Sequence, residues 1–146
     1  MAVYNDPVFG EMTYNYLWEK PRYISIFGQT YPIKIAAASF NEKPLTDEQR
    51  SAYTGFLKNE KRICSEIETL IIQYIETYFD ELSKYWENAR LIKTAKELSR
   101  VVTPKTLYFK RKGMAVLLLD CVWDPEHGIG VEIFPEQKVA SQDIFL

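Results

Sequence analysis

The strongest pattern of apolar and polar positions in the chain runs over residues 114–134. Residues 114–122 are apolar on both alternating faces and are interrupted by Asp120, a pattern typical of a strand that is covered on both sides. Residues 124–128 contain Asp, Pro and Gly, the residue types of a tight turn, and the apolar alternation resumes over residues 129–133. The pattern therefore predicts a β-hairpin at the centre of a sheet.

The N-terminal part of the chain alternates in the manner of short strands separated by turns. One half-buried strand is predicted over residues 14–18, where three aromatic side chains alternate with other residues, and Pro21 would end it. Two further strands are predicted over residues 23–27 and 31–37. The glycine-containing segment 28–30 would join them as a hairpin turn.

A long helix is the element with the clearest local signals. Residues 46–49 form a capping box, with Thr followed three positions later by Gln, and apolar residues then recur at helical spacing over residues 53–82. The apolar stripe lapses over residues 58–62, so we expect a bend there. A second capping box at residues 94–97 predicts a short helix that ends near Arg100.

The remaining segments complete the predicted fold. Pro104 opens a strand over residues 106–111, and residues 139–146 are interpreted as a last short strand. We therefore predict a single α+β domain over residues 1–146. Its antiparallel sheet would combine the N-terminal strands with a C-terminal four-strand meander, in one layer packed against one long helix and a short helix.

Composition and charge exclude several classes of partner. The 146 residues carry a formal net charge of −2, which offers no electrostatic argument for nucleic acid or for an anionic membrane. The N-terminus lacks the basic and apolar regions of a signal peptide, and no apolar run approaches the roughly 20 residues that span a bilayer. Cys64 and Cys121 lie among apolar neighbours, so we expect buried, reduced thiols and a cytoplasmic protein.

The predicted turn also holds the chain's candidate chemistry. Asp124, Glu126 and His127 lie within four residues, and such groups could bind a divalent metal or provide a general base. A zinc site needs more strong ligands than one His, so we expect no bound metal and no cofactor. In the alternative interpretation, which we favour over catalysis, Asp124 caps the turn and His127 bonds a carbonyl or a carboxylate.

A second candidate site lies on the long helix. Residues 63–83 carry five acidic side chains and no Lys or Arg. Glu66, Glu76 and Asp80 fall on the face opposite the apolar stripe, and Asp80 is expected near the helix C-terminus, where the helix dipole disfavours anions. The pattern favours a solvated, solubilising face, and the functional hypothesis that we keep beside it is that this face binds a basic protein partner.

The segment Cys-Val-Trp-Asp-Pro-Glu-His-Gly-Ile-Gly-Val at residues 121–131, followed by Ser-Gln-Asp at 141–143, resembles an uncharacterised bacterial domain family. Members of that family end in a Trp-Asp-x-Glu-His-Gly hairpin and a Gly-Gln-Asp strand, so Ser141 replaces a glycine here. The start of the long helix, over residues 49–57, is similar to that family as well. The resemblance implies no known activity.

Such domains resemble the small proteins of bacterial toxin–immunity loci, which implies binding to a partner protein. We therefore expect a non-enzymatic interaction protein of immunity type, which blocks a cognate protein by occupying its surface. One alternative is a metal-dependent or His-based hydrolase at residues 124–127. Another is a structural homo-oligomer subunit that assembles through an edge strand.

Overall fold

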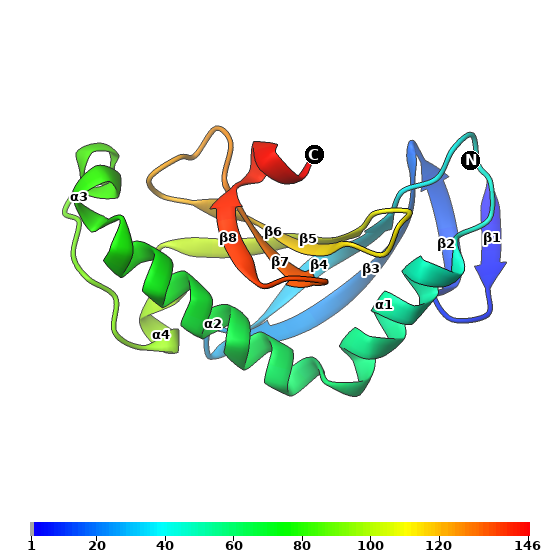
Figure 1. Cartoon of the computed structure of the whole chain (residues 1–146), viewed down its shortest axis with the longest axis horizontal. Coiled ribbons are helices and arrows are strands. Elements are labelled where there is room, and N and C mark those ends of the chain that lie inside the picture. Colours follow the sequence, from blue (N-terminus) through cyan, green and yellow to red (C-terminus); the bar gives the residue numbers. More distant parts are fainter. Residues whose placement is uncertain (1) are drawn as a thin grey trace.

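The computed structural model describes residues 2–146 and contains an eight-stranded sheet whose strands follow the order of the chain (Figure 1). The strands are β1 (Val3–Asp6), β2 (Gly10–Asn15), β3 (Leu17–Ile26), β4 (Gln29–Ala37), β5 (Val102–Phe109), β6 (Ala115–Cys121), β7 (Ile129–Phe134) and β8 (Lys138–Ser141). Neighbouring strands pair antiparallel with the exception of β4 and β5, which run parallel. The parallel junction is a departure from the expected antiparallel sheet.

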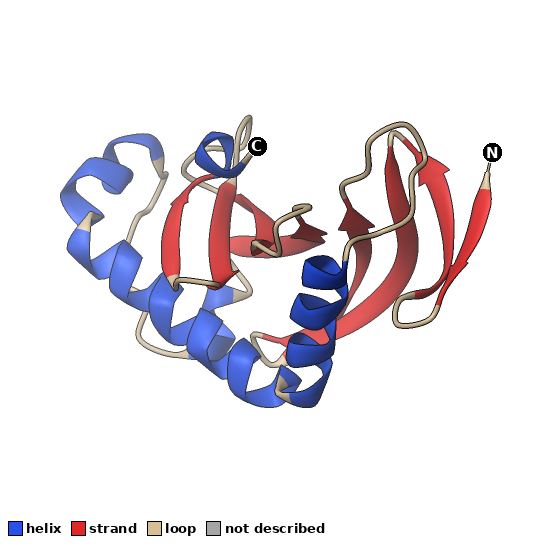
Figure 2. Ribbon diagram, turned by 45° about the vertical axis from the view of Figure 1, so that its right-hand side comes forward, coloured by secondary structure: helices blue, strands red, loops and turns tan. Residues whose placement is uncertain are grey.

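The helical segments are α1 (Asp47–Lys58), α2 (Glu60–Thr77), α3 (Phe79–Leu82), the 3₁₀ turn η1 (Ser83–Tyr85), α4 (Ala95–Leu98) and a C-terminal 3₁₀ turn η2 (Gln142–Phe145). All but η2 belong to the connection between β4 and β5, because parallel neighbours cannot be joined by a hairpin. Figure 2 shows the helices α1 and α2 running along one side of the strands. No helix within residues 2–146 is long and apolar enough to cross a membrane.

Gln49 binds the chain where β4 and β5 end side by side. Its side chain is fully buried, and its Nε2 donates to the carbonyl oxygens of Ala38 and Phe109, at 2.8 and 3.1 Å. Its Oε1 accepts the backbone N–H of Thr46 at 2.9 Å, which completes the predicted capping box. One side chain therefore caps α1 and ties its first turn to the ends of β4 and β5.

The predicted long helix is two helices. The chain departs from helical geometry at Asn59 (φ −127°, ψ 22°), inside the segment where the apolar stripe lapses, so the predicted bend is confirmed. At this boundary the guanidinium of Arg22, on β3, donates to both carboxylate oxygens of Glu60, at 2.8 and 2.6 Å. A bidentate pair of this kind fixes orientation as well as distance, so it sets where α2 starts across the sheet.

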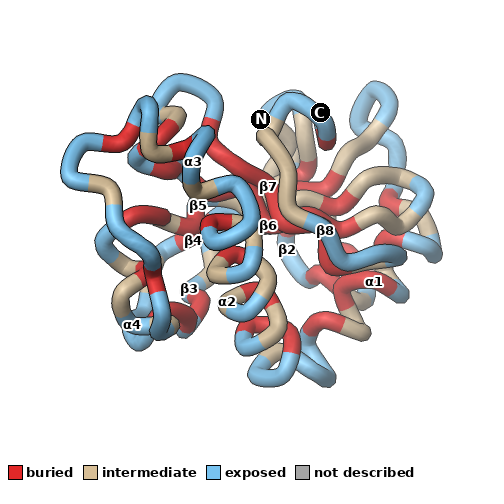
Figure 3. Tube along the Cα trace, turned by 60° about the vertical axis from the view of Figure 1, so that its left-hand side comes forward, coloured by how far each residue is buried: buried red, intermediate tan, exposed pale blue. Residues whose placement is uncertain are grey.

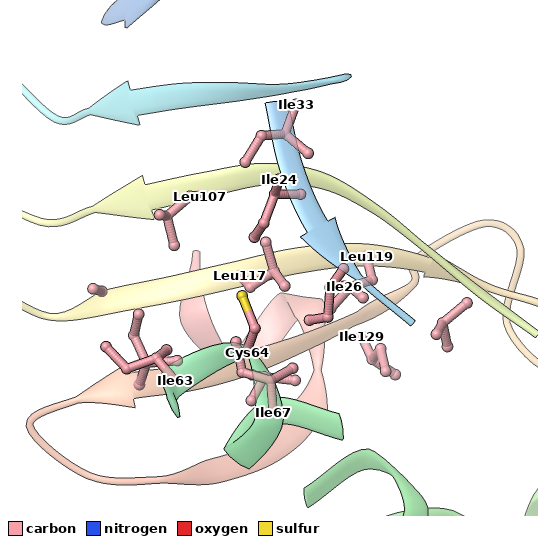
Figure 4. Packing of buried hydrophobic residues seen from close by; sticks show 14 of the residues in the cluster. Ile24, Ile26, Ile33, Ile63, Cys64, Ile67, Leu107, Leu117, Leu119 and Ile129 are labelled. Atoms are coloured by element: carbon pink, nitrogen blue, oxygen red, sulfur yellow. The ribbon is translucent and has the colours of Figure 1, made fainter. Parts of the chain in front are cut away.

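The main core lies between the helices and the sheet. Ile63, Cys64 and Ile67 of α2 project toward apolar side chains of β3–β7 (Figure 4). Buried residues are concentrated in β6 and β7 and along one side of α2 (Figure 3). This is the arrangement expected for strands whose apolar residues occur on both faces.

A second, smaller core covers the opposite face of β6. There Phe145 of η2 packs with Val116 and Leu118. The predicted strand over residues 139–146 is therefore wrong after Ser141, where the chain turns into η2 instead of staying extended. Gly130 leaves room for this contact, because a Cβ there would lie 2.5 Å from the Phe145 ring.

The predicted strand over residues 14–18 is also wrong. The aromatic residues span a tight hairpin turn, in which Tyr16 has a φ of 65° and separates β2 from β3. Pro21 lies inside β3 and does not end it. The pairing of β2 with β3 extends only to Glu19, so no β2 residue pairs with Pro21. A proline is tolerated where one side of a strand has no neighbour to receive a hydrogen bond.

Replacing Gln49 with Ala is expected to lower the free energy of unfolding by about 2–4 kcal/mol, because one of the two capping-box bonds is lost and the carbonyl oxygen of Ala38 loses its donor. Urea denaturation measures this loss. The matched control is Glu97→Ala, which removes the same capping-box position from α4, where the contacts are exposed. We expect the control to cost less than about 1 kcal/mol, and equal losses in the two variants would contradict the role given to Gln49.

Candidate functional site

A cleft of about 340 Å³ lies where the end of the helical layer meets the β6–β7 turn. Its lining includes the aromatic residues Tyr74, Tyr85 and Trp123 and the carboxylates of Glu81 and Asp124. Figure 1 shows α3 and the β6–β7 turn at the same end of the molecule. The cleft therefore combines three segments that are distant in the sequence, namely the end of α2 with α3 and η1, the β6–β7 turn, and the end of β8.

Packed aromatic rings form one wall of the cleft. Trp123 is only 6% exposed, and its ring centroid lies 5.7 Å from that of Trp86 and 6.5 Å from that of Tyr74. Tyr85, in contrast, is 68% exposed. The wall formed by Trp123 is thus held by core packing, whereas Tyr85 lies at the rim and can be reached by a partner.

The β6–β7 turn is held by its own polar groups. The carboxylate oxygen Oδ1 of Asp124 accepts the backbone N–H of His127 at 3.2 Å, and Nδ1 of the His127 ring lies 3.1 Å from the same oxygen. Gly128 has a φ of 74°, and a Cβ there would lie 2.4 Å from the carbonyl oxygen of Leu119, so other residues would strain the turn. Asp124 thus caps the turn and also contacts the ring of His127.

The charge state of His127 follows from these contacts. The hydrogen bond to Asp124 raises the pKa of His127, and the negative charges of Asp124, Asp143 and Glu126 add to the effect. Glu126 is exposed and acts on His127 as a nearby charge. The structure therefore brings His127 and Asp124 together in a contact that favours the imidazolium, which suits an ion pair better than a neutral general base.

The two cysteines are free and buried. The Cys121 thiol lies 3.8 Å from the carbonyl oxygen of Asp124, and burial raises the pKa of both Cys121 and Cys64 to about 12. A reactive cysteine needs a lowered thiol pKa, so neither thiol is suited to be a nucleophile. Among residues 2–146, no group of three or more His, Cys, Asp or Glu side chains is placed to hold a metal ion.

The acidic residues of the predicted helix face have different roles. Glu66 accepts hydrogen bonds from Arg62 at 2.6 Å and from Gln137 at 2.7 Å, so it links α2 to the β7–β8 turn. Its use as a freely available partner contact is therefore not supported by the geometry. Glu76 and Asp80 are exposed, as the sequence pattern predicts.

Asp80 and Glu81 lie outside α2. Because α2 ends at Thr77, both carboxylates lie just beyond its C-terminus, in the single turn of α3. Glu81 forms an exposed pair with Lys84 at 3.0 Å.

Sequence reasoning missed the cleft and its aromatic residues. In the sequence, Tyr74 is one residue of the apolar stripe of the helix, and Trp123 is the residue before the turn. Neither position indicates a cleft. The available signal was the aromatic content of 14% together with a tryptophan next to Asp124. Nothing local in the sequence indicates that Tyr85 lies beside them.

The fold and this cleft define a small α+β domain with a cleft lined by aromatic and acidic residues. The chain belongs to the family described as a domain of unknown function (DUF6985), whose model matches residues 8–146. This agrees with the resemblance to an uncharacterised domain. No curated protein and no solved structure matches the chain.

Proton NMR of His127, the chain's one histidine, tests the Asp124 contact directly. We expect a pKa above the ordinary value of about 6.5. Because the folded pKa is raised, the pair stabilises the fold fully below about pH 6.5, and this stabilisation is lost as the pH rises through the folded pKa.

The variant Asp124→Asn keeps an oxygen for the His127 backbone N–H but removes the charge, so the His127 pKa should return toward its ordinary value. Glu126→Gln is the control and should lower the pKa less, because Glu126 makes the weakest contribution. A His127 pKa that stays unchanged in Asp124→Asn would show that the ion pair does not form.

Proposed function

We propose that this protein is an interaction domain that binds a basic surface of a partner protein through the end of α2, α3 and the β6–β7 turn. The observation that supports this most directly is the exposure of Glu76 and Asp80 in the same helical segment that lines the aromatic cleft. Exposed carboxylates and a recessed aromatic wall are a combination suited to a cationic protein surface.

The charges of this segment are one-sided. Residues 74–82 contain three carboxylates and no Lys or Arg. Lys84 follows and pairs with Glu81, but both side chains are more than half exposed, and such a pair contributes little free energy. Glu81 can therefore exchange this partner for another cation. A surface of this kind accelerates association with a basic protein by electrostatic attraction.

We further propose that the domain acts as an immunity-type protein in a bacterial cytoplasm, where it blocks a cognate protein by occupying its surface. Residues 121–131 resemble an uncharacterised domain family, and the resemblance of such domains to the small proteins of toxin–immunity loci supports this assignment by analogy. The absence of a reactive thiol among Cys64 and Cys121 is compatible with a binding role in a reducing compartment.

The double charge reversal Glu76→Lys and Asp80→Lys tests the proposed surface. Proteins captured from host lysate by the wild-type domain are identified, and the strongest is purified and its association rate measured at several salt concentrations. We expect a basic partner, a rate that falls as salt rises, and a decrease of about tenfold or more in the double variant. Circular dichroism verifies that the variant is folded.

The matched control is Glu11→Lys with Glu42→Lys, which changes the net charge equally at exposed positions in β2 and in the loop after β4. This control should retain the association rate. Equal rates for the wild type and the Glu76/Asp80 variant, or equal losses in both double variants, would refute the proposed surface.

A further inference from the structure

We propose that the cleft between α3 and the β6–β7 turn receives the guanidinium group of an arginine side chain presented by the partner. This inference rests on the proposed function, because it identifies the chemical group that the acidic end of the molecule recognises. It concerns different side chains from those of the charge reversal above. The central residues are Trp123, Tyr85, Glu81 and Asp124.

The size of the cleft suits one long side chain. Its volume of about 340 Å³ is at the lower end of the range of roughly 300–1,000 Å³ for ligand sites. An arginine side chain can enter such a site while the backbone of the partner stays outside. A folded element of the partner would instead need a wider groove.

The aromatic lining favours a planar cation. Trp123 and Tyr74 both line the cleft, and their ring planes are inclined by only 35° to each other. Tryptophan is the strongest aromatic partner for a cation, and a guanidinium can also stack flat on a ring, which an ammonium cannot do. Trp123 is held by Trp86 and Tyr74 and forms a fixed part of the wall, whereas the ring of Tyr85 is 68% exposed and offers an open face to a guanidinium.

The carboxylates supply charge and hydrogen-bond acceptors. Both contacts of the Asp124 carboxylate with His127 involve Oδ1. The second carboxylate oxygen, Oδ2, can accept a hydrogen bond from a guanidinium. Glu81 contributes a second carboxylate to the lining. Guanidinium donors fit carboxylate oxygens in pairs, so Glu81 and Asp124 can orient an arginine that the rings have received.

The neighbouring charges leave the site acidic. The cations beside the cleft are Lys84, paired with Glu81, and His127, paired with Asp124. Asp143 and Glu126 also act on His127, so carboxylates outnumber cations around the turn. An anionic ligand would meet more carboxylates than cations around this turn, and an apolar ligand would remove charged groups from water without contributing a charge of its own.

NMR titration with N-acetyl-arginine methylamide tests the inference without any partner protein. The backbone amides of Gly128, Ile129 and Ser141 and the indole N–H of Trp123 report on the cleft, after conventional resonance assignment. We expect saturable shifts at these positions. The citrulline derivative, which has the same shape but no charge, should cause none, and the lysine derivative should bind more weakly because its ammonium cannot stack.

Two variants at exposed positions identify the site. Tyr85→Ala is expected to weaken arginine binding about 3- to 10-fold, because a cation–π contact is lost, and Glu81→Gln should weaken it as well. The control is Tyr23→Ala, since Tyr23 on β3 is 69% exposed and Tyr85 is 68% exposed. This control should leave the affinity unchanged.

Absence of saturable shifts, equal binding of citrulline and arginine, equal binding of lysine and arginine, or equal effects of Tyr85→Ala and Tyr23→Ala would each overturn the inference. The two proposals fail separately. If arginine binds the cleft but the Glu76 and Asp80 reversal leaves partner association unchanged, the proposed surface fails alone. If the reversal abolishes association but arginine does not bind, the arginine site fails alone.

Discussion

The parallel pairing of β4 with β5 is the constraint on which the rest of the structure depends. It joins Lys34–Ala37 to Thr106–Phe109, and no hairpin can make such a pair. The chain must therefore leave the sheet, cross its inner face as α1 and α2, and return. Gln49 donates to carbonyl oxygens at the adjacent ends of β4 and β5, and its Oε1 also accepts the backbone N–H of Thr46 at the start of α1. The direction of the helices, and so the position of the cleft at their far end, follows from this junction.

Elements that are determined by interactions within a few residues could be predicted from the sequence. The two capping boxes, the bend near Asn59 and the β6–β7 turn with Gly128 each have a cause within a few residues, and the structure contains all of them. The wrong strand prediction over residues 14–18 arose because alternation of aromatic and other residues has more than one structural cause. Around Tyr16 the aromatic alternation is produced by a hairpin turn, because residues on either side of it belong to different strands.

Non-local pairing could not be predicted, since it has no local signature. The parallel junction joins segments separated by all the α-helices, and Glu66 and Glu68 have partners in the β7–β8 turn and at Phe27. A helical wheel shows which residues share a face but does not show what packs against that face. For this reason the sequence correctly indicated Glu76 and Asp80 as exposed. It assigned Glu66 to the same surface, although the Glu66 carboxylate is bonded to Arg62 and Gln137 of the same chain.

The net charge of −2 does not describe how the charged side chains are distributed over the surface. A hollow beside β3–β5 is lined by three lysines, two of which are paired: Lys34 with Glu19 and Lys105 with Asp120. The end of α2 and the following turn of α3 carry the carboxylates of Glu76, Asp80 and Glu81. Potentials at a surface depend on such local groups within a Debye length of about 8 Å, so a nearly neutral protein can present a strongly acidic end. The aromatic cleft opens at that end, where a cation would gain both attraction and a ring to stack on.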